Sequence, residues 1–259
     1  MDIFSNEIKF CIHGCFNLFK RVFKSHVRYV IFLMVSVILF YTCQDDGDEL
    51  SSLGGEAYYP LRTGMVWVDS MTKINIDAPI GLYDTIKWVE KTTVDSISQA
   101  SGKEKIYCTN YFYDTTLEKW TLDHVYWFER DDVSLIRFEQ NLISLDMVFP
   151  LKEGTSWNTY AYSVQSDTSI RTVVNEINQP RSIKGEMYDS ALVLHHHIDS
   201  TLIYKYTNKS YYAKNIGLIY WDQVKIISDD PDFDYTLPIE ERIKTATFIK
   251  QKRNYNEIY

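Results

Sequence analysis

Apolar and polar residues alternate along most of the chain from Tyr58 onwards, and many of the apolar positions hold aromatic or β-branched side chains. A period of two is typical of strands with one buried face, and few segments carry the 3.6-residue period of a helix. We therefore expect an all-β or β-dominated α+β fold, with a single antiparallel domain over residues 58–259 that forms a strongly curved sheet or a partly open barrel. The predicted strands are Val66–Asp69, Thr85–Val94, Glu104–Tyr113, Val125–Glu129, Ser134–Phe138, Trp157–Val164, Ile170–Ile177, Ala191–His197, Leu202–Tyr212, Leu218–Ile227 and Lys244–Gln251.

A different pattern precedes this domain. Residues 29–41 are thirteen uncharged residues, all apolar or aromatic except Ser36, and basic residues stand before them. A helix that spans a bilayer needs about 20 residues, whereas the apolar core of a secretory signal has about 7–15. The run thus predicts a signal peptide over residues 1–42, with its basic flank on the cytoplasmic side. Because residues 1–24 add nothing that a signal needs, a later start codon is one interpretation of the long head.

Cys43 stands directly after the apolar run and is followed by the acidic stretch Gln44–Glu49. This order resembles the lipobox of bacterial lipoproteins, although Phe40 and Thr42 replace the usual leucine and small residue. The resemblance implies that Cys43 is acylated and becomes the mature N-terminus, with residues 43–57 as lipidated cysteine and acidic tether. Each buried methylene of an acyl chain contributes about 0.8 kcal/mol, so several chains hold a protein on a membrane. An uncleaved signal anchor is the alternative.

One pattern occurs twice, ninety positions apart. Residues 59–67 and 149–157 share the form aromatic-Pro-Leu-basic-x-Gly-x-x-Trp. Proline fixes φ and glycine permits a positive φ, so we expect each copy to form a turn that leads a tryptophan onto a new strand. The two tryptophans, Trp67 and Trp157, would then anchor corresponding regions of the core. Either a duplicated half-domain or one turn used twice explains the copies.

The chain also resembles an uncharacterised family of lipoproteins from Bacteroidetes. The resemblance rests on the segment 59–67, the pair Tyr126-Trp127, the segment 149–158 and the late Tyr-Ala-Lys-x-Ile-Gly-Leu-Ile-Tyr of residues 212–220. It covers most of residues 58–250. It implies a lipid-anchored protein of the cell envelope with a β-rich domain, in the outer membrane, and the acids after the cysteine favour surface exposure. It implies no activity and no cofactor.

Charge narrows the class of partner. The first 43 residues hold five of the 27 Lys and Arg and two of the 35 Asp and Glu, which leaves a net charge of −11 on residues 44–259. Phosphate backbones would repel such a domain, so nucleic acid is not expected as a partner. The same charge keeps a surface domain soluble.

Cysteine and histidine offer two candidate sites in the domain. Cys108 is the one cysteine of residues 44–259, so an internal disulfide is not possible there, and in a strand-like run it is expected to be a small buried hydrophobe. His195 and His197 would share one face of a strand, which makes them weak candidates for a metal site. Zinc needs three or four ligands, His196 would lie on the other face of the strand, and His124 is the one further histidine of the domain. A polar strand is the simpler interpretation, and we expect no metal and no cofactor.

Acidic and aromatic clusters complete the candidates. Asp229–Asp234 holds four carboxylates but lacks the turn glycine and late glutamate of a calcium loop, so we expect an exposed acidic loop. The charged runs at 129–132 and 240–242 are interpreted as solvated turns, although paired carboxylates across a cleft could serve acid–base chemistry. Four tyrosines could stack on sugars or line a lipid cavity if exposed, whereas core or cross-strand pairing is their usual role; these are Tyr111, Tyr113, Tyr211 and Tyr212.

No motif assigns a catalytic residue. The chain lacks a nucleophile elbow, a phosphate-binding glycine loop and a metalloprotease helix motif, which favours a non-enzymatic role without excluding an enzyme. We expect a membrane partner through the lipid on Cys43 and a domain that binds an apolar ligand, a glycan or an envelope protein. The alternatives are an envelope hydrolase that uses carboxylates or a metal, and a structural subunit of a surface assembly.

Overall fold

The computed structural model describes residues 55–164 and 170–254. They belong to the second of two units into which the chain divides, Leu50–Tyr259. The predicted signal peptide and Cys43 lie outside the described residues. No helix within the described ranges has both the length and the apolar character to span a membrane.

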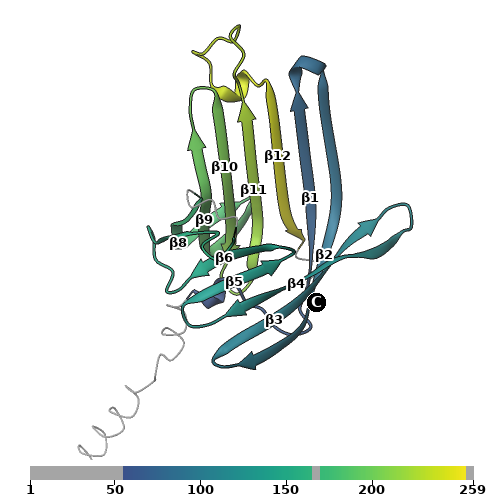
Figure 1. Cartoon of the computed structure of the whole chain (residues 1–259), viewed down its shortest axis with the longest axis vertical. Coiled ribbons are helices and arrows are strands. Elements are labelled where there is room, and N and C mark those ends of the chain that lie inside the picture. Colours follow the sequence, from purple (N-terminus) through teal and green to yellow (C-terminus); the bar gives the residue numbers. More distant parts are fainter. Residues whose placement is uncertain (1–54, 165–169, 255–259) are drawn as a thin grey trace, which may run out of the picture. The chain divides into compact units, whose positions relative to one another are not determined.

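Strands form nearly all regular structure in the described part of the chain (Figure 1). Twelve strands there pair into one antiparallel sheet, which confirms the expected all-β fold. The strands are β1 (Val66–Asp77), β2 (Leu82–Ala100), β3 (Lys103–Asp114), β4 (Lys119–Arg130), β5 (Ser134–Glu139), β6 (Leu142–Val148), β7 (Ser156–Asn158), β8 (Arg171–Ile183), β9 (Glu186–Ser200), β10 (Tyr204–Ala213), β11 (Gly217–Ile227) and β12 (Thr245–Asn254). Three 3₁₀ turns accompany them, η1 (Glu56–Tyr58), η2 (Ala78–Ile80) and η3 (Ile239–Glu241).

Two six-stranded meanders build this sheet, with the order β6-β5-β4-β3-β2-β1-β12-β11-β10-β9-β8-β7. Strands β1 and β12 join the halves through ten residue pairs, from Val68↔Asn254 to Asp77↔Thr245. The edge strands β6 and β7 also meet, because the Leu145 N–H donates to the Thr159 carbonyl at 2.7 Å. The Trp157 indole N–H donates to the Leu145 carbonyl, also at 2.7 Å. The strongly curved sheet is thus nearly closed.

The repeated sequence pattern forms the same turn in both halves. The Gly64 N–H donates to the Val94 carbonyl of β2 at 2.8 Å, and the Gly154 N–H donates to the Val174 carbonyl of β8 at 2.8 Å. Both glycines have φ of 80°, a conformation that side chains with a Cβ rarely adopt. Each turn leads into the first strand of its meander. The two halves therefore share both the nine-residue pattern and a six-stranded meander.

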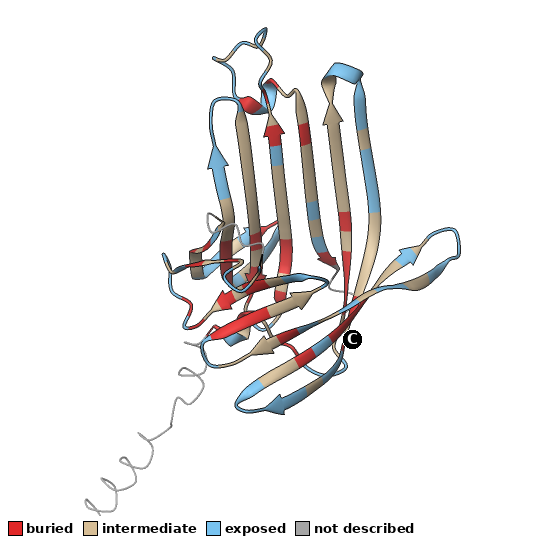
Figure 2. Cartoon of the chain, in the orientation of Figure 1, coloured by how far each residue is buried: buried red, intermediate tan, exposed pale blue. Residues whose placement is uncertain are grey.

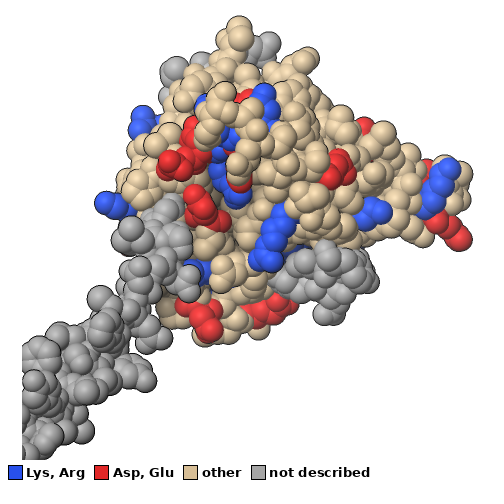
Figure 3. All heavy atoms as spheres, turned by 90° about the horizontal axis from the view of Figure 1, so that it is seen from below, with Lys and Arg blue, Asp and Glu red and all other residues tan. Residues whose placement is uncertain are grey.

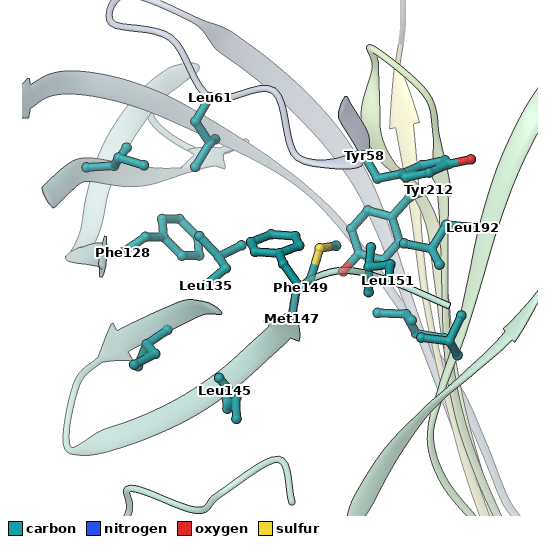
Figure 4. Packing of buried hydrophobic residues seen from close by; sticks show 14 of the residues in the cluster. Tyr58, Leu61, Phe128, Leu135, Leu145, Met147, Phe149, Leu151, Leu192 and Tyr212 are labelled. Atoms are coloured by element: carbon teal, nitrogen blue, oxygen red, sulfur yellow. The ribbon is translucent and has the colours of Figure 1, made fainter. Parts of the chain in front are cut away.

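The buried residues gather where β3–β6 cross the other strands, in the lower part of Figure 2. Tyr58, Phe128, Leu135, Met147 and Leu192 are among the most buried side chains of this cluster (Figure 4). Burial of a tyrosine requires a partner for its hydroxyl. The Tyr58 hydroxyl has three, since it lies 2.9 Å from Asn178 Oδ1 and 2.8 Å from Ser190 Oγ and accepts the Asn178 N–H at 3.2 Å.

Several strands are longer than predicted, and the structure corrects the prediction further at two places. Strand β6 was not predicted, although Ile143, Leu145 and Met147 alternate with Ser144 and Asp146, which face a cavity instead of the core. The predicted strand Trp157–Val164 is wrong beyond Asn158. The Asn158 side-chain oxygen accepts the Tyr160 N–H at 2.9 Å, and this local turn ends the ladder.

Candidate functional site

Two adjoining cavities lie inside the curved sheet. The smaller has a volume of about 150 Å³ and draws on β1–β5, the start of β11 and the end of β12. Its lining residues are Tyr59, Pro60, Leu61, Met65, Trp67, Asp69, Glu90, Thr92, Asn110, His124, Tyr126, Phe128, Arg137, Glu139, Ile216, Gly217, Leu218, Gln251 and Arg253. Most of this wall comes from the first meander.

The larger cavity has a volume of about 400 Å³ and draws mainly on the second meander. Its lining residues are Tyr59, Arg137, Leu142, Ser144, Asp146, Thr159, Tyr160, Ile170, His196, His197, Tyr206, Asn208, Ser210, Tyr212, Leu218, Trp221, Gln223 and Gln251. The two walls share Tyr59, Arg137, Leu218 and Gln251, so the cavities adjoin at these four residues.

Arg137 of β5 is the basic residue common to both cavities. Its Nε lies 3.2 Å from Asp146 Oδ2, and its Nη1 lies 3.2 Å from Glu139 Oε2. The Asp146 carboxylate raises the pKa of the Arg137 guanidinium, which is therefore charged. Burial raises the pKa of Asp146, while the Arg137 charge and the Ser144 hydroxyl, which donates at 2.6 Å, act against that rise.

His124 of β4 bridges two carboxylates at the wall of the smaller cavity. Its Nε2 lies 2.6 Å from Glu139 Oε1, and its Nδ1 lies 2.9 Å from Asp123 Oδ2. Burial lowers the pKa of His124, but the hydrogen bonds to these carboxylates outweigh it and the pKa is raised. Glu139 is therefore shared between Arg137 and His124.

A second guanidinium in the smaller cavity is also neutralised. Arg253 of β12 pairs with Asp69 of β1, and the Gln251 side-chain amide donates to the same carboxylate at 2.7 Å. The Arg253 guanidinium also lies over the Trp67 ring, 4.9 Å from its centroid. The tryptophan of the first sequence repeat thus packs against the ion pair that joins the two meanders.

His196 belongs to a chain of buried hydroxyls at the wall of the larger cavity. Its Nδ1 lies 3.0 Å from Thr172 Oγ1, and its Nε2 lies 2.7 Å from Ser210 Oγ. Thr172 continues the chain to Thr159 at 2.7 Å. Burial, helped by the charge of Arg137, lowers the pKa of His196 to about 4, so its imidazole is neutral at pH 7.

The prediction that His195 and His197 share a face is wrong. The register of β9 and β10 shifts between Asn208 and Lys209, so that His197 pairs with Asn208 and His195 with Lys209. A bulge of this kind breaks the alternation of side chains. As a result, His196 and His197 line the larger cavity and His195 does not.

Within residues 55–164 and 170–254, no group of three or more His, Cys, Asp or Glu could hold a metal ion. The acidic run at Asp229–Asp234 lies in the loop between β11 and β12 and is mostly exposed. Asp229 pairs with Lys244 at 3.0 Å, and Asp234 accepts the Thr236 N–H at 3.0 Å in a local turn.

Aromatic rings and side-chain amides share one wall of the larger cavity. The Trp221 indole N–H donates to Asn208 Oδ1 at 2.6 Å, which fixes the ring beside the amide. Tyr206 lies on β10 with Asn208, and Gln223 lies on β11 with Trp221, and both line the same cavity. This part of the wall offers ring faces together with hydrogen-bond donors and acceptors.

The four tyrosines predicted as candidates divide between the inside and outside of the sheet. Tyr212 is buried and lines the larger cavity. Tyr111 lies beneath the Lys91 ammonium at 4.9 Å. The other two make ring contacts across strands, Tyr113 with Trp120 at 5.4 Å and Tyr211 with Tyr220 at 5.6 Å.

Cys108 is free and 1% exposed, as the sequence predicts for a small buried hydrophobe. Burial raises the pKa of its thiol to about 12.

On the face seen in Figure 3, acidic and basic side chains are interspersed. Sequence reasoning missed Arg137, Glu139 and Asp146, whose polar positions on β5 and β6 are those expected of a solvated strand face.

The sequence matches no protein-family model, and no curated protein matches it. Two solved structures are similar. One is a Bacteroides fragilis protein described as an inferred exported protein with a YmcC-like fold; it is 10% identical, with a TM-score of 0.36 over 74% of this chain and 96% of that one. The other is described as an inferred lipoprotein from Parabacteroides distasonis; it is 10% identical, with a TM-score of 0.30 over 75% of this chain and 97% of that one.

Proposed function

We propose that the chain is a lipid-anchored protein of the cell envelope whose β domain binds a saccharide inside its curved sheet. The observation that carries the proposal is the wall of the larger cavity, where Tyr206 and Trp221 stand beside Asn208, Gln223 and Gln251. Its volume of about 400 Å³ falls within the range of about 300–1,000 Å³ that is usual for ligand sites.

This wall suits a sugar better than an apolar ligand. A pyranose ring has an apolar face for an aromatic ring and hydroxyls that both donate and accept, and a side-chain amide offers both functions in return. An apolar molecule would cover the amides without giving them partners, at a cost of about 1–3 kcal/mol for each buried group. Among the ligands that the sequence left open, a glycan is therefore favoured.

The envelope address rests on the N-terminal pattern of basic flank, apolar run and Cys43. Lipid on Cys43 would place the domain at a membrane surface. The resemblance to lipoproteins of Bacteroidetes favours the outer membrane. The direct test is metabolic labelling with a palmitate analogue and fractionation, for the wild type beside Cys43→Ser. We expect label and membrane attachment for the wild type and a soluble, unlabelled product for the variant. Membrane attachment of an unlabelled variant would instead support an uncleaved signal anchor.

Saccharide binding is tested by calorimetry on the mature protein with maltose, cellobiose and N,N′-diacetylchitobiose, and with laurate as an apolar probe. Trp221→Ala removes a ring from the larger cavity, and Trp127→Ala removes one from the outer face of β4, where it stacks on Phe138. We expect at least one saccharide to bind, and Trp221→Ala to weaken it roughly tenfold or more while Trp127→Ala does not.

Three outcomes would contradict the proposal. Binding of laurate but of no saccharide would favour an apolar ligand. Equal losses in the two tryptophan variants would move the site away from the larger cavity. Cleavage of the bound saccharide, detected by chromatography of the products, would indicate a hydrolase instead of a binding protein.

A further inference from the structure

We infer that the saccharide is electrically neutral and at least two units long, and that it lies across both cavities with Arg137 at the junction. The inference rests on the proposed function and names the class of ligand for the same site. Three features of the interior carry it: the shared wall of the two cavities, the pairing of both guanidiniums there with carboxylates, and the position of Arg137.

The shape of the interior favours an extended ligand. The cavities adjoin at Tyr59, Arg137, Leu218 and Gln251, so a molecule in the larger one can continue into the smaller one. At about 150 Å³ the smaller cavity lies below the usual range for an independent ligand site. It nevertheless repeats the chemistry of the larger cavity, because the Trp67 ring lines it together with the amide of Asn110. These properties are those of a second subsite.

The charges of the interior disfavour an acidic sugar. Arg137 contacts two carboxylates, Glu139 and Asp146, and Arg253 is paired with Asp69. His196 is neutral, because burial holds its pKa near 4. A carboxylate of the ligand would therefore be a third anion beside Arg137, and bringing an extra charge out of water without its own partner is costly.

Arg137 has the geometry to hold the junction of such a ligand. Its Nη1 and Nε contact the carboxylates, and Nε also donates to Ser144 Oγ at 3.4 Å, so that these contacts fix the planar guanidinium in place. Its Nη2 has no hydrogen-bond partner among the residues that the structure describes. A guanidinium held in this way keeps N–H donors for a neutral acceptor, such as a hydroxyl or ring oxygen between two sugar units. We assign to Arg137 the role of the specificity-determining residue.

The test compares matched ligands by calorimetry: glucose with maltose, N-acetylglucosamine with N,N′-diacetylchitobiose, and galacturonate with digalacturonate. We expect a neutral disaccharide to bind roughly tenfold or more tightly than its own monosaccharide, and the acidic pair not to bind. Thr92→Val removes a hydroxyl from the smaller cavity alone, and Gln223→Ala removes an amide from the larger cavity alone. The first variant should weaken only the disaccharide, and the second should weaken both lengths.

Arg137→Lys keeps the charge and loses the planar donors, so it should reduce the advantage of the disaccharide while the melting temperature shows that the fold persists. A monosaccharide that binds as tightly as its disaccharide, or an acidic sugar that binds more tightly than the neutral ones, would overturn this inference and leave the proposed function standing. A chain that binds none of these six sugars and no cellobiose would contradict the proposed function itself.

Discussion

Asp69 and Arg253 form a buried ion pair between β1 and β12, the first and last strands along the chain. Arg253 Nε lies 3.0 Å from Asp69 Oδ1, and Nη2 lies 3.2 Å from Oδ2. The two side chains are only 7% and 6% exposed. Their strands pair directly at this position, although the residues are 184 positions apart in the chain. The pair therefore links the ends of the two meanders inside the domain.

We expect Arg253→Met to lower the free energy of unfolding by about 3–5 kcal/mol, because it leaves the Asp69 carboxylate buried without its cation. The double variant Asp69→Leu/Arg253→Met should recover part of this loss, since no charge is then left unpaired. Urea denaturation measures all three proteins. Lys105→Met serves as the control, because it breaks the more exposed pair Lys105–Glu129 and should cost at most about 1 kcal/mol. A loss in Arg253→Met no larger than in this control would contradict the prediction.

The second junction, between β6 and β7, depends on the tryptophan of the other repeat. Trp157→Phe removes the indole N–H that donates to the Leu145 carbonyl and leaves that carbonyl without this partner. The expected loss of stability is about 1–3 kcal/mol, together with faster amide hydrogen exchange at Leu145. Denaturation and hydrogen exchange followed by mass spectrometry provide the two measurements.

The repeat supplies a matched control for this change. Trp67 occupies the corresponding place in the first meander and is equally buried, at 6% exposure for both tryptophans. Among the described residues its indole N–H makes no hydrogen bond, so Trp67→Phe loses a similar volume but no donor. If both variants lost the same stability and the exchange of Leu145 did not change, the hydrogen bond would have no role at this junction.

Alternation of side chains made the antiparallel fold predictable, whereas the repeated turn left open whether the chain has two corresponding halves or uses one turn twice. The ends of strands were less predictable, because contacts between strands far apart in sequence decide them. β1 extends to Asp77 through its pairing with β2 and β12, beyond the predicted end at Asp69. The sequence around Asn158 carried a turn signal, but aromatic residues on both sides of it suggested a longer strand.

The candidate site was harder to predict than the fold, because the interior of this sheet is polar. Alternation places Arg137 and Glu139 on one face of β5, and a charged face is normally assigned to solvent. The pairing of β5 with β4 and β6 brings these residues beside His124 and Asp146, and the curvature of the sheet turns them towards the cavities. The bulge opposite Asn208 then turns His197 inward beside His196, and a register shift of this kind leaves no mark in a single sequence.

The Cys108 thiol should resist alkylation in the folded protein. A pKa of about 12 leaves roughly a thousandth of the thiolate present at pH 8 in an ordinary cysteine, and the thiolate is the reactive form. We expect iodoacetamide to label Cys108 roughly 1,000-fold more slowly in the native state than in denaturant, by mass spectrometry of the peptide that carries it. Native labelling within about tenfold of the denatured rate would show that this strand opens readily.

The free energy of unfolding of the domain should fall as the pH drops below 6.5, because His196 is protonated more readily in the unfolded chain. Burial lowers the pKa of this imidazole from 6.5 to about 4, so between these values the unfolded chain takes up a proton that the folded chain does not. The stabilising contribution of the neutral imidazole is therefore complete above pH 6.5 and is lost as the pH falls towards 4. Between pH 7 and pH 5 the expected loss is about 2 kcal/mol.

His196→Gln isolates this contribution, since glutamine does not titrate and can keep a hydrogen bond to Ser210. The variant should be less stable than the wild type at pH 7, but its free energy of unfolding should change less between pH 7 and pH 5. Other groups titrate in both proteins, among them His124 with its raised pKa, so the difference between the two urea-denaturation series reports His196 alone. Parallel pH profiles would mean that His196 is protonated in the folded domain. This result would contradict the conclusion that its imidazole is neutral at the wall of the larger cavity.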